Sequence, residues 1–140
     1  MRAIFDINVV LDVLLQREPH HSTSSQVLTL ADRREISGYF CAASVDTTLY
    51  LLERKLDKLV AKRAIHTLLD ILQICPVDET VIRGALNLQW SDVEDAIIYA
   101  SGRAAGLDTV ITRNAKDFKQ SELRVLTPAE VVAQQKNRSS

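Results

Sequence analysis

The chain of 140 residues is 46% hydrophobic and 25% charged, and its formal net charge is −1 at pH 7. This length suits one domain around one core, and the composition is that of an average globular protein, which excludes a disordered or fibrous chain. The nearly neutral charge excludes attraction to nucleic acid by the chain as a whole, but it permits a local basic patch beside an acidic site.

Strand-like and helix-like segments alternate in the first half of the chain. Residues 3–6 are an apolar run that ends in an acid, and the apolar spacing of residues 8–15 is typical of a helix. Pro19 and the Ser/Thr cluster at 22–25 mark a break before the next helix. In order, the sequence predicts a strand at 3–6, helices at 8–15 and 26–35, a strand at 39–44, and helices at 46–55 and about 57–72.

The same alternation continues in the second half. Pro76 stops a strand, a glycine ends the helix that starts within residues 90–95, and Pro128 is expected at the first position of the last helix. In order, the sequence predicts a strand before Pro76, a helix at 79–88, a helix from 90–95 to Gly102 or Gly106, a strand at 107–112, a turn-rich stretch at 113–118, a strand at 123–127 and a helix at 128–135.

This order predicts an α/β fold with one domain at residues 1–135 and a flexible C-terminal tail at 136–140. Alternating strands and helices favour a parallel sheet, here of about four or five strands, with helices on both faces. Such sheets bind their ligands at the carboxyl ends of the strands. A site is therefore expected at that edge.

Cysteine usage and the N-terminal stretch bear on the compartment. Cys41 and Cys75 are the only cysteines, and both lie in strand-like sequence, which favours two buried thiols over a disulfide or a zinc site. Asp6 and Asp12 interrupt the apolar start, so it is not a signal peptide, and no run approaches the ~20 apolar residues of a membrane helix. A reducing, cytoplasmic location away from the membrane is expected.

Residues 90–95 read WSDVED and stand directly before an apolar, helix-like stretch. On a helix, Asp92 and Asp95 lie on one face with Cβ atoms about 5–6 Å apart, where like charges repel. The local interpretation is an N-cap at Ser91 or Asp92, with the other acids in a first turn that favours negative charge. The alternative is a divalent cation held by oxygen ligands, which requires carboxylates from elsewhere.

Two more acids are predicted at the same edge of the sheet. Asp6 closes the first strand, Asp117 follows the strand at 107–112, and the helix that Asp92 and Asp95 open leads into that strand. Four carboxylates in an apolar setting repel one another, and Mg²⁺ relieves this repulsion while taking only one or two of them directly. Asp6 and Asp117 also have a local interpretation as helix or turn caps.

Three stretches of the chain match a known pattern: FDINVVLDVLL, SDVEDAIIYASGRAAGLDTVITRNAKDF and LRVLTPAEVV. Together they resemble the PIN domain family, and within it the VapC-like toxins of bacterial toxin–antitoxin pairs. The resemblance covers nearly the whole chain. It implies that Asp6, Asp95 and Asp117 are catalytic acids that bind Mg²⁺ or Mn²⁺ and that Asp92 completes the catalytic pocket. The residues that it implies as supports for these acids or for the scissile phosphate are Asn8, Thr112 and Asn114.

One position departs from the family pattern. Many members carry a glutamate on the helix after the second strand, where this chain has Thr47. Asp46 is adjacent, and Glu53 lies about 9 Å further along the helix axis than Thr47 at 1.5 Å per residue. Either is a candidate replacement acid, and a missing acid bears on the number of bound metals and on activity.

The resulting hypothesis is a metal-dependent endoribonuclease that hydrolyses single-stranded or loop RNA as the toxin of a type II toxin–antitoxin pair. One alternative is a catalytically weak or inactive PIN-like module that binds RNA or protein. Another is a hydrolase with Asp6 as nucleophile, which Asn8 disfavours because such an enzyme wants a second acid there. The resemblance also implies a homodimer and a cognate antitoxin. The apolar residues that either face a partner or belong to the core are Leu49, Tyr50, Leu52, Leu56 and Leu59.

Overall fold

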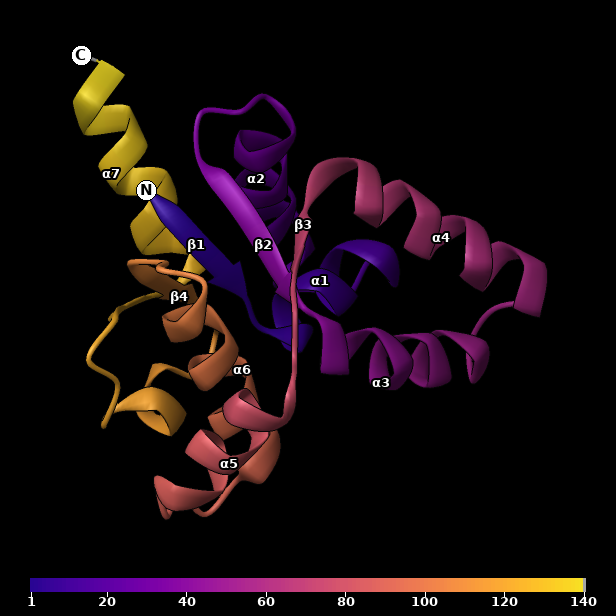
Figure 1. Ribbon diagram of the computed structural model, residues 1–140. Coiled ribbons are helices and arrows are strands. Elements are labelled where there is room, and N and C mark those ends of the chain that lie inside the picture. The colour runs from indigo at the N-terminus through magenta and orange to yellow at the C-terminus, as the bar shows by residue number, and fades with distance from the viewer. Residues whose placement is uncertain (140) are drawn as a thin grey trace.

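Five short strands pair in parallel throughout one sheet, in the order β3-β2-β1-β4-β5 (Figure 1). The computed structural model describes residues 1–139. The strands are β1 (Arg2–Phe5), β2 (Ser37–Cys41), β3 (Gln73–Cys75), β4 (Thr109–Ile111) and β5 (Arg124–Leu126). The chain builds the sheet outwards from β1 to β3 and then crosses to β4 on the other side of β1. The strand order therefore reverses between β1 and β4, where open α/β sheets bind ligands.

Helices follow the strands in the predicted alternation. They are α1 (Ile7–Leu14), α2 (His21–Asp32), α3 (Ala42–Glu53), α4 (Lys58–Ile71), α5 (Glu79–Asn87), α6 (Val93–Ala104) and α7 (Pro128–Ser139), with the 3-10 helix η1 (Ala115–Phe118) between β4 and β5. The predicted α/β class, with a parallel sheet and helices on both faces, is confirmed. Helix α7 includes residues 136–139 of the expected tail, and Ser140 lies outside the described residues.

Two helices begin earlier than the sequence predicts. Helix α2 starts at His21, so the Ser/Thr cluster lies inside the helix and not before it. Ser24 is fully buried there and its hydroxyl donates to the Asp12 carboxylate at 3.2 Å, so a tertiary contact overrides the local preference of serine for caps. Helix α3 starts at Ala42, which ends β2 three residues before the predicted end of that strand.

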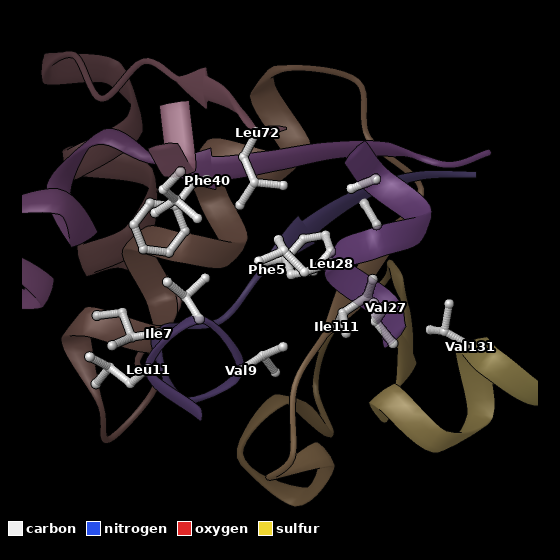
Figure 2. Close-up of a cluster of buried hydrophobic side chains, with 14 of the residues drawn as sticks. Phe5, Ile7, Val9, Leu11, Val27, Leu28, Phe40, Leu72, Ile111 and Val131 are labelled. Atoms are coloured by element: carbon white, nitrogen blue, oxygen red, sulfur yellow. The ribbon is translucent and has the colours of Figure 1, made fainter. Parts of the chain in front are cut away.

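The core has two parts, one on each face of the sheet. Ala3 and Phe5 of β1 point to one face and Ile4 to the other, as the alternation of a strand requires, and all three are fully buried. Figure 2 shows the first cluster, in which Phe5, Phe40 and Ile111 of the sheet meet side chains of α1, α2 and α7. The second cluster lies under α6 and η1. Both faces of the central strands are covered, which is typical of parallel sheets.

Helices α3 and α4 lie side by side and extend away from the sheet (Figure 1). Leu52 is fully buried, so it belongs to the core. Leu49 and Leu56 are half-buried against the core. Tyr50 and Leu59, by contrast, are 62% and 55% exposed. Of the apolar residues predicted either to face a partner or to belong to the core, only Tyr50 and Leu59 are therefore exposed enough to form a partner surface.

Both cysteines lie in the sheet at paired positions of β2 and β3. Cys41 and Cys75 are fully buried free thiols, as predicted. Burial raises the pKa of the Cys75 thiol to about 11, so it stays protonated. Among residues 1–139, no helix is long and apolar enough to cross a membrane.

Candidate active site

Asp6 lies at the carboxyl end of β1, where the strand order reverses, and is only 7% exposed. Its carboxylate caps α1 by accepting the Ile7 backbone N–H at 2.8 Å. Its Oδ2 accepts the Thr112 hydroxyl at 2.7 Å and the Asn8 side-chain amide at 3.2 Å. Asp6 is therefore the cap of α1, and Asn8 and Thr112 both donate to the same carboxylate.

The start of α6 carries the WSDVED acids. Asp92 is the N-cap, and its carboxylate accepts the backbone N–H of Asp95 at 3.0 Å. Asp95 is half-buried in the first turn, whereas Asp92 and Glu94 are exposed. The capping interpretation is correct for Asp92, but it leaves the carboxylate of Asp95 without a capping role.

The acids that the sequence places at this edge influence one another's pKa values. Burial raises the pKa of Asp95 to about 7, and the negative charges of Asp6, Asp92, Asp117 and Glu94 contribute to the rise. Burial also raises the pKa of Asp6, against the hydrogen bonds from Thr112 and Ile7, and Asp117 and Asp92 add to the rise. The four predicted carboxylates, which follow β1, open α6 and lie in η1, are therefore close enough to interact through their charges.

A cavity of about 600 Å³ opens beside these acids. Asp92, Asp95 and Asp117 line it. The other lining residues are Gln89, Trp90, Ser91, Lys116, Lys119 and Gln120. The cavity therefore combines carboxylates, two lysines and an indole ring within reach of one ligand.

An aromatic contact beside the cavity joins α6 and η1. The Trp90 ring stacks on Tyr99 of α6 with ring centroids 4.8 Å apart, and it meets Phe118 of η1 edge-on at 5.9 Å. This contact packs α6, which carries Asp95, against η1, which carries Asp117.

A family model described as a PIN domain matches residues 2–116. The chain belongs to the PIN domain family. Ribonuclease VapC1 of Aquifex aeolicus is 26% identical over 136 residues, which span 92% of each protein. VapBC2 from Rickettsia felis, bound to a promoter DNA fragment, matches with a TM-score of 0.70 at 15% identity, over 91% of this chain and 98% of that chain. A toxin–antitoxin complex from Klebsiella pneumoniae matches with a TM-score of 0.69 at 21% identity, over 90% and 97%.

This PIN domain also contains a buried ion-pair network that sequence reasoning missed. Asp12 of α1 is fully buried. Arg113 donates to both of its oxygens, from Nε at 2.6 Å and from Nη2 at 3.3 Å, and Arg17 donates from Nε at 3.0 Å. The Arg113 backbone N–H donates to Oδ1 of Asn8 at 3.4 Å. The signal in the sequence is an acid within an apolar helix together with an arginine directly after a buried strand.

The network holds the turn that follows β4. Arg113 stands between Thr112, which donates to Asp6, and Asn114. The Asn114 backbone N–H donates to the Thr112 hydroxyl at 3.0 Å, and its carbonyl accepts the Asp117 N–H at 2.9 Å. The side chain of Asn114 is exposed, and the backbone of this residue links Thr112 to Asp117.

Neither of the two candidate replacement acids lines the cavity. Asp46 and Glu53 are both exposed on α3. The fifth carboxylate near the site is Glu94, whose pKa is raised by the partial desolvation of this exposed residue and by the charges of Asp92 and Asp6. The WSDVED stretch contains this residue, but the three-residue spacing of Asp92 and Asp95 does not single it out.

The donor set suits a hydrated hard cation. Within residues 1–139, no three Asp, Glu, His or Cys side chains surround a common point as the ligands of one ion do. Mg²⁺ takes one or two carboxylates directly and keeps several waters, so it requires no such cage. The half-buried Asp95 with its raised pKa and the buried Asp6 are oxygen donors whose repulsion a cation relieves.

Proposed function

We propose that this PIN domain is a Mg²⁺- or Mn²⁺-dependent endoribonuclease that hydrolyses RNA phosphodiester bonds. The observation that carries the proposal is the convergence of four carboxylates at the reversal of strand order, with the pKa of Asp95 at about 7. The similarity to Ribonuclease VapC1 supports the reaction class. The proposed metal ligands are Asp6, Asp95 and Asp117.

The residues of the site would have different roles in the hydrolysis. A bound divalent ion supplies an activated water and neutralises the charge that develops on the phosphate. Asp6 is held by three neutral donors, which fix its orientation. Asp92 and Glu94 are exposed at the start of α6, so a carboxylate of the cluster is free to take the proton of the attacking water.

Hydrolysis by water is favoured over attack by Asp6 itself. Asn8 stands where such an enzyme wants a second acid, and its amide donates to Oδ2 of Asp6. With 7% exposure, Asp6 is also better suited to hold a metal ion at the edge of the sheet than to attack a phosphorus atom in line. The nucleophilic-aspartate alternative is accordingly not carried further. RNA that is single-stranded or looped is the proposed substrate, because its phosphates and bases are accessible to a side-chain-lined cavity.

A second candidate function is a PIN-like module that binds RNA or a protein with little or no cleavage. It is favoured by one observation, that neither of the exposed α3 acids Asp46 and Glu53 lines the cavity. The two functions differ in whether the acids bind a divalent ion.

A calorimetric titration with Mn²⁺ separates the two functions. The wild-type chain is expected to bind Mn²⁺, and Asp95→Asn to lose most of that affinity. The matched control is Asp70→Asn, at an exposed carboxylate of α4, which should bind as the wild type does. Wild-type and Asp95→Asn chains with the same Mn²⁺ isotherm would favour the binding module.

We further propose that the chain is the toxin of a type II toxin–antitoxin pair and acts in the cytoplasm as a homodimer. Toxin–antitoxin complexes are among the structures with this fold. The exposed apolar side chains of Tyr50, Leu59 and Val60 on α3 and α4 offer a partner surface. The two reduced, buried thiols suit a reducing compartment.

A further inference from the structure

The cavity beside the acids has a second set of lining groups that the proposed chemistry does not use. Trp90, Lys116 and Lys119 line it together with Asp95 and Asp117. Its volume of about 600 Å³ lies within the ~300–1,000 Å³ typical of small-molecule sites. There is room for a ligand beyond the atoms that react.

We propose that Trp90, Lys116 and Lys119 form a subsite for one nucleotide of single-stranded RNA adjacent to the scissile phosphate. The indole stacks on the base, and the two ammonium groups hold a backbone phosphate. This proposal rests on the proposed function, because the strand must pass the carboxylates to be cut.

The two lysines are placed to act on one phosphate. Lys116 lies in η1 and Lys119 directly follows it. Side chains three residues apart in a 3-10 helix project in the same direction, because the helix has three residues per turn. Both are exposed, and the ion pairs within residues 1–139 involve neither of them. They supply the positive charge that an otherwise acidic cavity needs to attract RNA.

Trp90 is held in a fixed orientation at the cavity wall. Tyr99 stacks against the ring and Phe118 meets it edge-on, yet the residue remains half-buried and lines the cavity. An aromatic ring fixed in this way is a platform for a base, since every base has a face that stacks.

The backbone before Trp90 turns at a helix end. Gln89 follows the C-cap Leu88 of α5 and adopts a φ of 60°, the left-handed conformation in which helices commonly end. This turn directs the chain from α5 to the Trp90 ring and the first acids of α6.

The chain contains a single tryptophan, so its emission reports on this subsite alone. A labelled single-stranded RNA of about ten nucleotides, within the ~4–16 that one single-strand-binding fold covers, is titrated into the wild-type chain in Ca²⁺ buffer, with RNA integrity checked afterwards. Fluorescence anisotropy of the label measures binding, and tryptophan emission is followed in parallel. We expect the emission to be quenched with the same concentration dependence as the anisotropy rises.

The lysines are tested by salt dependence. The double variant Lys116→Gln/Lys119→Gln is expected to bind several-fold more weakly. It should also lower the slope of log K against log salt by about 0.7, because the two lysines neutralise one phosphate and each neutralised phosphate of a single strand accounts for about 0.7 of that slope. The control is Lys58→Gln/Lys62→Gln, at exposed lysines of α4, which should keep the wild-type slope.

Either of two results overturns the subsite: no RNA binding by the wild-type chain, or binding that leaves either the tryptophan emission or the salt slope of the lysine variant unchanged. A chain that cleaves RNA without quenching would retain the nuclease and lose the subsite. A chain that is quenched but never cleaves would retain the subsite and lose the nuclease.

Discussion

Two buried aspartates in the first fifteen residues have opposite surroundings. Asp12 has no exposed surface and accepts hydrogen bonds from two arginines and Ser24. Asp6 accepts only from neutral donors, and burial raises the pKa of its carboxyl. The charge of Asp12 is therefore balanced by two arginines of the chain. Within residues 1–139, Asp6 accepts hydrogen bonds from no cationic side chain, so a bound cation would stabilise its charged form.

Loss of an arginine from the Asp12 network should be costly. Arg113→Met leaves a fully buried carboxylate with one arginine partner, and removal of one member of a buried pair typically costs about 3–5 kcal/mol. Arg113→Lys should lose less, because a charge remains. Urea unfolding measures both, and a loss below about 1 kcal/mol for Arg113→Met, the range of an exposed ion pair, would show that the pair contributes little.

The acidic cluster predicts how stability depends on pH without metal. The folded chain keeps protons on Asp95 and Asp6 to higher pH than the unfolded chain, because both pKa values are raised on folding. The contribution of these carboxyls to the free energy of unfolding should therefore be largest near pH 4 and fall as the pH rises through about 7, the pKa of Asp95.

The variant that tests this pH dependence is Asp95→Asn, which removes the carboxyl group with the most strongly raised pKa. Its thermal melting temperature should depend less on pH than that of the wild type and should exceed it above the Asp95 pKa of about 7 in chelator. Mg²⁺ should raise the wild-type melting temperature in that pH range and leave the variant nearly unchanged. Parallel pH profiles for the two chains would contradict the proposed repulsion.

At the scale of elements, local rules predicted the order of strands and helices but not all of their ends. Pro128 opens α7 and Asp92 caps α6, as the sequence indicates. The start of α2 was predicted too late, because Ser24 is buried against Asp12 across the structure. No local signal reveals a contact between helices that are separated by a loop.

The C-terminus of α2 offers a test of backbone strain. Arg34 has a φ of 62°. Its N–H donates to the Ala31 carbonyl at 3.1 Å, and that of Glu35 donates to the Leu30 carbonyl at 2.9 Å. This is a Schellman motif, whose left-handed residue is usually glycine. Arg34 is exposed, so Arg34→Gly should stabilise the chain by about 0.5–1 kcal/mol.

Chemical denaturation of the two chains measures this gain. The control is Arg33→Gly at the preceding, right-handed position, which should destabilise because glycine has more freedom to lose there. Equal losses from both substitutions would show that the left-handed position carries no strain.

For the whole molecule, parallel topology explains why the acids were predictable. The carboxyl ends of parallel strands meet at one edge, so Asp6 and Asp117 were assigned to one place from their order along the chain. The Asp12 network, the contribution of Glu94 and the wall formed by Trp90 and the lysines depend on neighbours distant in sequence. Periodicity and spacing do not encode these contacts.

The partner surface is also a property of the assembled fold. Tyr50 is 62% exposed on α3, so Tyr50→Asp should weaken self-association or antitoxin binding by placing a charge in an apolar contact. Mn²⁺ binding should be unchanged. Light scattering over a range of concentrations measures the first and calorimetry the second. A monomer at every concentration, with unchanged antitoxin affinity in the variant, would reject this surface.

The converging carboxylates are proposed to make a metal-dependent ribonuclease, and cleavage of a labelled single-stranded RNA tests this most directly. The wild type and the Asp70→Asn control should cleave in Mn²⁺ and not in chelator. Asp6→Asn and Asp95→Asn should fold and lose at least ~100-fold in rate, the lower end for removal of a group that acts in acid–base chemistry. Cleavage by Asp95→Asn at the wild-type rate, or by the wild type in chelator, would contradict the assigned site.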